Sequence, residues 1–350
     1  MSTPTNTETS PKTVPTYSRK DFLSSTEPRW CAGCGTFATF NGITRAFVNA
    51  GIEREKFAVV SGIGCSSRLP YYSNTYGFHT IHGRAPTVAM GLKMANPDLN
   101  VWVITGDGDG LSIGGNHFIH LMRRNPNIKV VLFNNQIYGL TKGQTSPTSP
   151  LGAKTKSAPY GSVDRPMHPL TVALGAGATF VARVPDTDNE LMYQVLNAAS
   201  KHEGVAIVEV LINCVIFNDK VFESITNKET RPDTTVLLEA GKPLLFGANK
   251  DRGIIMKNDR PTVAKIGEGG ARLEDVIIHD PQNPNSGYAF MLAEMGDSEL
   301  PVPYGIFRQI HEHVHKPHAG KGNKEGLLKT LRGSNTWSVD NSGKISSLEK

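Results

Sequence analysis

The chain has 350 residues, of which 38% are hydrophobic and 20% charged, and this composition excludes a disordered or collagen-like protein. The formal net charge of +5 is spread thinly along the sequence, without the basic block that tracks nucleic acid. No apolar run reaches the length of about 18 residues that spans a membrane, and residues 1–19 lack the apolar stretch of a secretory signal. We therefore expect a globular protein of the cytoplasm.

Hydrophobic periodicity predicts alternating helices and strands between about Phe22 and Asn218. The predicted helices are 41–51, 87–94, 114–124, 171–177 and 189–202, and the predicted strands are 57–61, 101–105, 128–133, 179–183 and 205–211. Strand, helix and strand in succession imply a parallel sheet, so we expect a doubly wound α/β fold with ligands at the carboxyl ends of its strands.

Beyond Asp219 the pattern fades into short polar pieces separated by Pro and Gly. We therefore expect three parts: a flexible N-terminal segment over 1–20, a cofactor-binding domain over 21–219, and a partly ordered C-terminal extension over 220–350.

A glycine-rich turn with two carboxylates, Gly106-Asp107-Gly108-Asp109-Gly110, directly follows the strand 101–105. Its small residues allow the backbone to approach phosphates closely. The turn does not match a dinucleotide fingerprint, because Leu111 occupies the place of the third glycine. Two carboxylates beside phosphates require a cation between them, and Mg²⁺ prefers such oxygen ligands.

A second set of oxygen donors follows the neighbouring strand, in Asn134-Asn135-Gln136-Ile137. Either element alone is more often an ordinary surface turn. Together, on adjacent strands, they match the signature by which thiamine diphosphate enzymes hold Mg²⁺ and pyrophosphate. The resemblance implies Asp107, the Asn135 side chain and the Ile137 carbonyl as metal ligands, and the backbone of 106–108 as the pyrophosphate site.

Four cysteines, Cys31, Cys34, Cys65 and Cys214, are too few and too scattered for a disulfide framework. Their spacing is compatible with zinc, with an iron-sulfur cluster, or with four inert buried thiols, and spacing alone does not separate these alternatives.

The residues around these cysteines resemble one family. Trp30-Cys31-Ala-Gly-Cys34-Gly35, Ser61-Gly-Ile-Gly-Cys65-Ser-Ser-Arg68 and Tyr76-Gly-Phe-His-Thr-Ile-His82-Gly-Arg84 resemble the beta subunits of 2-oxoacid:ferredoxin oxidoreductases. The likeness continues through 106–116, 134–150 and 214–218. It implies a thiamine diphosphate-binding fold in which the four cysteines hold a [4Fe-4S] cluster. It also implies that Ile63, Gly64, Cys65, Asp109 and Leu140 border the cofactor, and that His82 and Arg84 contact substrate or pyrophosphate.

The resemblance implies coenzyme A-dependent oxidative decarboxylation of a 2-oxoacid, with electrons passing through the cluster to ferredoxin. It also implies an obligate partner, because the family's cofactor-activating glutamate lies on an alpha subunit with a pyrimidine-binding domain. An αβ heterodimer or its dimer is therefore expected. A zinc-stabilised relative without activity and a structural subunit without cofactor are the alternatives, of which the intact metal loop disfavours the second.

The substrate prediction depends on Leu140-Thr141-Lys142-Gly143-Gln144, where pyruvate-type relatives tend to carry Asn-Thr-Gly-Gly-Gln. Lys142 adds a cation that would pair with the distal carboxylate of 2-oxoglutarate. A surface lysine without contacts is the alternative, and pyruvate, branched-chain and indolepyruvate enzymes remain alternative types. The histidines at 311, 313, 315 and 318 are expected in a solvated tail rather than at a metal.

Overall fold

The computed structural model describes residues 16–267, 270–296, 299–315, 337–339 and 345–347. The chain divides into two compact units, Met1–His315 and Lys316–Lys350. Of the expected flexible segment 1–20, residues 1–15 lie outside the described part, and a short 3-10 helix covers Arg19–Phe22. In the second unit, β12 (Trp337–Val339) and β13 (Ile345–Ser347) form an antiparallel pair.

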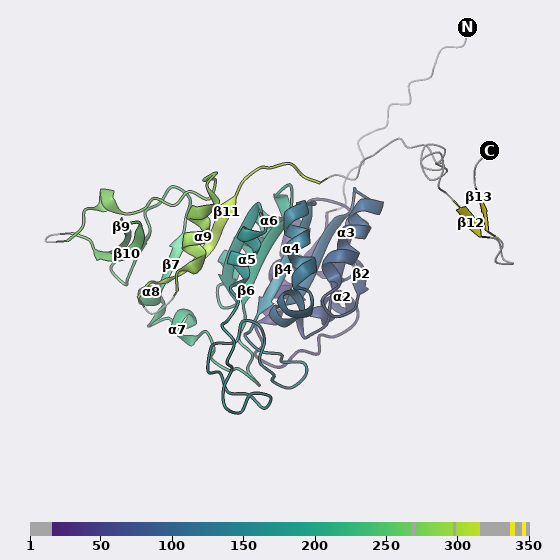
Figure 1. Ribbon diagram of the computed structural model, residues 1–350, viewed down its shortest axis with the longest axis horizontal. Coiled ribbons are helices and arrows are strands. Elements are labelled where there is room, and N and C mark those ends of the chain that lie inside the picture. Colours follow the sequence, from purple (N-terminus) through teal and green to yellow (C-terminus); the bar gives the residue numbers. More distant parts are fainter. Residues whose placement is uncertain (1–15, 268–269, 297–298, 316–336, 340–344, 348–350) are drawn as a thin grey trace, which may run out of the picture. The chain divides into compact units, whose positions relative to one another are not determined.

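The first unit is built on an eight-stranded sheet of order β2-β1-β3-β4-β6-β5-β11-β7 (Figure 1). Strands β1 to β6 pair in parallel, β11 pairs antiparallel with β5, and β7 lies parallel to β11. The strands are β1 (Phe57–Ser61), β2 (Tyr76–His79), β3 (Asn100–Gly106), β4 (Ile128–Asn134), β5 (Phe180–Pro185), β6 (Ala206–Leu211), β7 (Thr235–Leu238) and β11 (Val302–Gln309).

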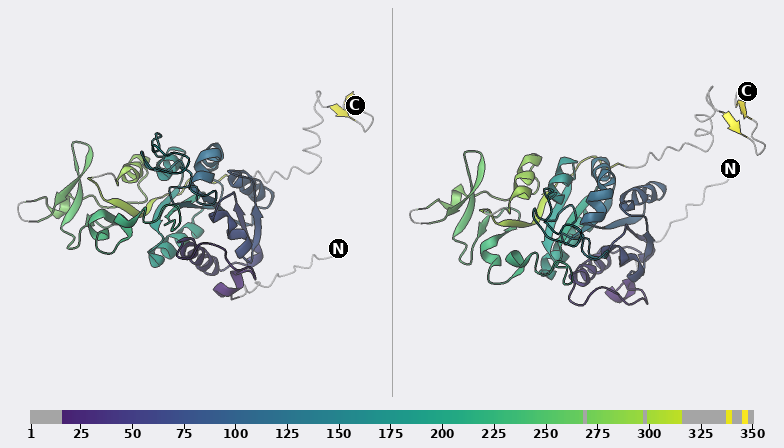
Figure 2. Two further views of the ribbon diagram at one scale, coloured as in Figure 1. Left: turned by 90° about the horizontal axis from the view of Figure 1, so that it is seen from below. Right: turned by 60° about the horizontal axis from the view of Figure 1, so that its bottom comes forward.

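Helices cover both faces of this sheet (Figure 2). One hydrophobic cluster joins the sheet to α3 (Ala85–Ala95), α4 (Gly115–Arg124), α5 (Pro169–Gly175) and α9 (Ser286–Glu294). The other joins it to α1 (Thr36–Asn49) and α6 (Asn189–Lys201). The short helices are α2 (Leu69–Tyr72), α7 (Glu223–Thr226) and α8 (Arg231–Thr234).

Alternation along the central strands explains this two-sided burial. In β3, Val101 and Val103 enter the first cluster, whereas Trp102 and Ile104 enter the second. Side chains of successive strand residues point to opposite faces, so a strand that is apolar throughout is buried on both. The expected doubly wound, mainly parallel sheet is confirmed.

Two N-terminal elements differ from the prediction. Helix α1 begins at Thr36 rather than at Asn41, because Gly35 is its N-cap. Strand β2 was not predicted, since all four of its residues are exposed at the sheet edge and leave no apolar pattern.

The region from 220 to 315 also differs from the expected partly ordered extension. Strands β11 and β7 complete the main sheet, α9 packs against α5, and β8 (Leu245–Phe246), β9 (Arg252–Lys257) and β10 (Arg260–Lys265) form a second sheet. A boundary at residue 219 would therefore divide one continuous sheet.

The histidine-containing segment after β11 is bound to the domain through its backbone. The His315 N–H donates to the Asn125 carbonyl (3.1 Å), and Asn125 Nδ2 donates to the His313 carbonyl (3.1 Å). The His311 ring stacks on His202, with centroids 6.1 Å apart. His318 lies outside the described residues. Among the described helices, none is long and apolar enough to cross a membrane.

A pair of truncations tests this division of the chain. Ending the chain at His315 removes no strand of the eight-stranded sheet, so we expect the same midpoint of thermal unfolding as for the full chain. Ending it at Asp219 removes β11 and with it Phe307, which is fully buried. Loss of a buried Phe side chain alone typically costs about 3–5 kcal/mol, so the shorter chain should lose its cooperative transition. Equal calorimetric transitions in both truncations would contradict the continuous sheet.

Candidate functional site

The ten residues predicted to bind the cofactor line one cavity of about 100 Å³ at the carboxyl ends of β1, β3 and β4. They are Ile63, Gly64, Cys65, Gly106, Asp107, Gly108, Asp109, Asn135, Ile137 and Leu140. The parallel pairing of the three strands brings their ends to one edge of the sheet. Residues separated by more than 70 positions in the sequence thus meet around one space.

Asp107 is buried in the wall of this cavity, with one carboxylate oxygen anchored by hydroxyl groups. Ser146 Oγ donates to Asp107 Oδ2 at 2.6 Å, and Thr148 Oγ1 lies at 2.6 Å from the same oxygen. Both hydroxyls thus contact the same carboxylate oxygen, Oδ2. Burial raises the pKa of Asp107 to about 6, although the two hydroxyls act in the opposite direction.

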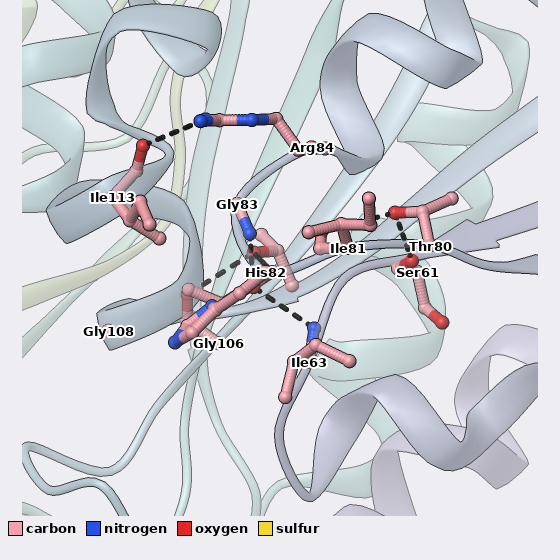
Figure 3. A network of polar contacts seen from close by, with 12 residues as sticks. Ser61, Ile63, Thr80, Ile81, His82, Gly83, Arg84, Gly106, Gly108 and Ile113 are labelled. Carbon is pink, nitrogen blue, oxygen red and sulfur yellow. Dashed lines mark hydrogen bonds and ion pairs between the residues drawn. The ribbon is translucent and has the colours of Figure 1, made fainter.

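Asp109 lines the cavity as predicted, and its carboxylate also binds the protein itself. Asp109 Oδ1 accepts from the backbone N–H of Ile63 (3.0 Å) and of Gly83 (2.7 Å), and it lies 2.6 Å from His82 Nδ1. Thr105 Oγ1 donates to Oδ2 at 2.6 Å. Figure 3 shows Ile63, His82 and Gly83 converging from two loops on this carboxylate. Asp109 therefore fastens the ends of three chain segments together.

These contacts also fix the orientation of His82. Because Asp109 Oδ1 already accepts two backbone N–H groups, it acts as an acceptor toward the imidazole, and His82 Nδ1 donates to it. The second ring nitrogen, Nε2, is then available to the cavity that His82 lines. Gly62 permits this arrangement, since a Cβ there would lie 2.0 Å from Asp109 Oδ2.

The two adjacent asparagines point to different surroundings. Asn135 lines the cavity, and its Oδ1 accepts from the Ile137 N–H at 3.3 Å. Asn134 does not line it and instead donates from Nδ2 to Glu209 (2.7 Å), a buried carboxylate that pairs with Arg183 at 2.7 Å. Only Asn135 is therefore placed to present its side chain to a ligand in the cavity.

A second cavity, of about 220 Å³, brings all four cysteines together. Cys31 is exposed, whereas the other three thiols are half-buried. Burial raises the pKa of Cys65 to about 11, and the neighbouring thiols act in the same direction. Burial also raises the pKa of Cys34. Neighbouring half-buried thiols disfavour each other's ionisation. A bound cation or cluster would offset this cost by stabilising the thiolates.

The arrangement of the cysteines can be compared with that of a site for a single metal ion. Among the residues that the structure describes, no three His, Cys, Asp or Glu side chains converge closely enough for one metal ion. A zinc site needs its thiolates at about 2.3 Å from one ion.

The two cavities share a wall made of Thr36, Cys65, Asn135, Gly139 and Leu140. A Cβ on Gly139 would lie 3.5 Å from the sulfur of Cys214, 3.8 Å from that of Cys65 and 3.9 Å from Asn135 Nδ2. One layer of residues thus separates the predicted metal loop from the cysteine ligands.

Two predicted residues do not reach the cavity. Arg84 donates from a guanidinium nitrogen to the Ile113 carbonyl at 3.2 Å, as Figure 3 shows, and does not line the cavity. Lys142 is exposed in a turn with a φ of 76°, and the cavity wall ends one residue earlier, at Thr141. Of the three side chains predicted to act on substrate, only His82 lines this cavity.

Sequence reasoning missed the hydroxyl groups that support the carboxylates. Thr105, Ser146 and Thr148 are each buried and hydrogen-bonded to Asp107 or Asp109. The run of hydroxyl residues at 145–149 was the available signal. Its meaning depends on a loop that returns to the strand ends, which periodicity does not reveal.

Comparison with known proteins yields one family model, described as the C-terminal TPP-binding domain of thiamine pyrophosphate enzymes, which matches residues 62–210. The chain is 46% identical over 332 residues to the 2-oxoglutarate oxidoreductase subunit KorB of Mycobacterium tuberculosis, a match that covers 92% of this chain and 88% of that protein. It is 48% identical over 185 residues to the 2-oxoglutarate synthase subunit KorB of Archaeoglobus fulgidus, covering 53% of this chain and 69% of the relative.

A solved structure is also similar. It is the 2-oxoglutarate:ferredoxin oxidoreductase from Magnetococcus marinus, with 2-oxoglutarate, coenzyme A and succinyl-CoA bound in that protein. The TM-score is 0.70 at 34% identity, and the match covers 89% of this chain and 96% of the other.

The state of Asp107 leads to a pH-dependent prediction. Burial raises the pKa of this carboxylate to about 6, and a proton would compete with the metal ion that the sequence predicts there. The affinity for Mg²⁺–thiamine diphosphate should therefore fall about tenfold per pH unit below about pH 6. Thr148→Val removes a hydroxyl that lowers this pKa and should move the onset to higher pH, whereas Thr148→Ser should not. Titration calorimetry from about pH 5 to about pH 8 measures both onsets, and identical onsets in the two variants would refute the anchoring role.

Proposed function

The chain belongs to the beta subunits of the 2-oxoacid:ferredoxin oxidoreductases, and from this premise we propose the reaction and the residues that serve it. The relatives and the similar structure identify it as the beta subunit of a 2-oxoglutarate oxidoreductase. The proposed reaction is the coenzyme A-dependent oxidative decarboxylation of 2-oxoglutarate to succinyl-CoA and CO₂, with electrons passed to ferredoxin. The observation that carries the proposal is the shared wall between the metal-loop cavity and the four-cysteine cavity.

We propose that the first cavity holds Mg²⁺–thiamine diphosphate. Asp107 Oδ1, the Asn135 side chain and the Ile137 carbonyl would hold the metal, and the backbone at 106–108 would meet the pyrophosphate. The fit rests on a buried carboxylate that two hydroxyl groups hold in the cavity wall, at the edge of a sheet of this family. When bound, thiamine diphosphate supplies the electron sink that the decarboxylation of a 2-oxoacid requires.

The second cavity is proposed to hold a [4Fe-4S] cluster on Cys31, Cys34, Cys65 and Cys214. Support comes from four free cysteines around one cavity and from their match to the positions of the family's motifs. Cys65 contributes to both cavity walls, so the proposed electron donor and acceptor lie on either side of one residue. Free thiols of this kind are kept available in reducing compartments, which favours the cytoplasm.

The chain is proposed to be inactive without its alpha subunit. Among the described residues that line the cofactor cavity there is no glutamate, so the group that activates thiamine diphosphate must come from a partner. Apolar side chains near this edge of the sheet are strongly exposed: Ile81 is 75% and Ile113 is 53% accessible. Exposed apolar side chains around an incomplete site are typical of a surface that a subunit covers.

Lys142 is proposed to recognise the distal carboxylate of 2-oxoglutarate. The side chain is exposed, and it follows the last cavity-lining residue of its loop, Thr141. A positive charge at the mouth of the cavity would face the end of a substrate whose reacting carbon lies inside. This geometry makes Lys142 a rim residue, and its effect should be smaller than that of a buried ion pair.

The first test concerns the cluster. Cys214→Ser replaces one sulfur ligand, so iron content and visible absorption of the anaerobically purified αβ enzyme should fall to a small fraction of the wild-type values. Val215→Ala, a change of the neighbouring side chain, should leave both unchanged. A colourless wild-type protein with about one zinc per chain would instead support the non-catalytic alternative.

The second test concerns substrate choice. Lys142→Ala should reduce kcat/KM for 2-oxoglutarate relative to 2-oxobutyrate by up to about fivefold, because an exposed charge pair contributes up to about 1 kcal/mol. Lys142→Arg, which retains the charge, should keep most of the preference. An unchanged ratio in the Lys142→Ala enzyme rules out the recognition role, and an equal loss with both substrates would assign Lys142 to the loop.

A further inference from the structure

Five residues around the cysteine cavity form a surface that we call the cluster face: Arg29, Cys31, Arg68, Ile216 and Phe217. All five line the same cavity as the other three cysteines. Cys31 is exposed, whereas Cys34, Cys65 and Cys214 are half-buried, so the cysteine set is open to solvent on the side of Cys31. The cluster face therefore surrounds the side on which electrons can leave.

The charge of this face is positive. Arg29 and Arg68 belong to no ion pair within the part of the chain that the structure describes. Arg68 donates to the Arg29 carbonyl at 3.2 Å, which holds the two arginines side by side. The described residues lining this cavity include no aspartate or glutamate, and Glu27 is the nearest carboxylate in sequence to Arg29.

The centre of the face is apolar. Ile216 is 60% and Phe217 is 37% accessible, although both are large hydrophobic side chains. The Phe217 ring is supported from behind, because a Cβ on Gly143 would lie 3.1 Å from it. Arginine and aromatic residues are enriched in protein interfaces, and exposed apolar groups beside them mark a contact surface rather than a solvated one.

A purely internal role for the arginines would be to balance the negative charge of the cluster. Such a role predicts buried guanidinium groups, whereas Arg29 is exposed. It also gives no reason for two exposed hydrophobic side chains at the same place. A partner that is acidic at its rim and apolar at its centre accounts for both features.

Resting on the proposed function, we propose that the cluster face is the docking surface for a small acidic iron-sulfur electron carrier of the ferredoxin class. Interfaces for electron transfer are small, below about 1,200 Å² in total, so a patch of this size suffices. Each carrier takes one electron from the reduced cluster and leaves it oxidised by one electron. Two carriers are thus reduced for each 2-oxoacid oxidised.

The test compares two electron acceptors in the assembled αβ enzyme. With an acidic ferredoxin at low ionic strength, Arg29→Glu should lower kcat/KM at least about tenfold and flatten its dependence on salt, because steering by charge is lost. Arg68→Gln, a smaller change of charge, should lower it about threefold. With a small viologen dye, which needs no docking surface, both variants should keep the wild-type rate.

The matched control is Arg260→Glu, the same change of charge on the exposed β9–β10 hairpin. Figure 1 shows this hairpin at the opposite end of the first unit from α2, the helix that directly follows Arg68. The control should leave ferredoxin reduction unchanged. An equal fall in the control and in Arg29→Glu would mean that net charge alone, and not the cluster face, governs the rate.

Other outcomes also overturn the docking proposal. A raised KM for coenzyme A with the viologen acceptor would assign the arginines to that ligand. Loss of iron, or of co-purification with the alpha subunit, in Arg29→Gln as well as in Arg29→Glu would assign them to the cluster or to that interface. If Arg29→Glu does not assemble with the alpha subunit but Arg29→Gln does, the ferredoxin kinetics are measured with Arg29→Gln. Unchanged ferredoxin kinetics in that variant would refute docking. A wrong proposed function can be told apart from a wrong docking proposal. If the proposed function were wrong, the wild-type enzyme would not reduce the viologen with any 2-oxoacid.

Discussion

One buried carboxylate holds the active end of this protein together. Asp109 is almost fully buried, and it receives hydrogen bonds from two backbone N–H groups, an imidazole and a hydroxyl. An unsatisfied buried donor costs about 1–3 kcal/mol, so the loop ends after β1 and after β2 depend on this acceptor. Both loops border the cofactor cavity. The position of the cavity wall therefore depends on hydrogen bonds within the protein.

The two carboxylates of the glycine-rich turn have different hydrogen-bond partners. Both are acidic residues of one short motif, and the sequence gives no reason to separate them. In the structure, Asp109 binds the backbone of two loops as well as lining the cavity, whereas one oxygen of Asp107 is held by hydroxyl groups. One strand away, Asn134 joins the buried Arg183–Glu209 pair and Asn135 lines the cavity. In each pair, one residue joins separate segments of the chain.

The positions of the central strands could be predicted from the sequence, whereas the directions of the side chains could not. Strands β1, β3, β4 and β6 are apolar runs that are buried on both faces, and periodicity located each of them within two residues. The residues of the cavity were found through motifs that follow those strands. The motifs give the order of residues and not the direction of their side chains. They therefore do not reveal that Asp109 binds two backbone N–H groups while it lines the cavity, that Arg84 binds the Ile113 carbonyl, or that Lys142 lies just beyond the cavity wall. Strands β7 and β11 escaped prediction because β11 pairs with β5, far away in the sequence, and β7 pairs in turn with β11. Strand β11 itself also contains Pro303 and Gly305.

The wall between the two cavities explains why this fold suits an electron-transferring enzyme. Its residues come from the N-terminal part of α1, from the turn after β1 and from the loop after β4, so three distant segments must meet at one edge of the sheet. At Gly139 the wall is thin, because a Cβ at this position would already be within van der Waals reach of two cysteine sulfurs and of Asn135 Nδ2. A thicker wall would separate the proposed electron sink from the proposed cluster, and no wall would let the cluster compete for the ligands of the metal. The parallel sheet meets both demands, because adjacent strands end about 5 Å apart and the loops that follow them are held in place by Asp109.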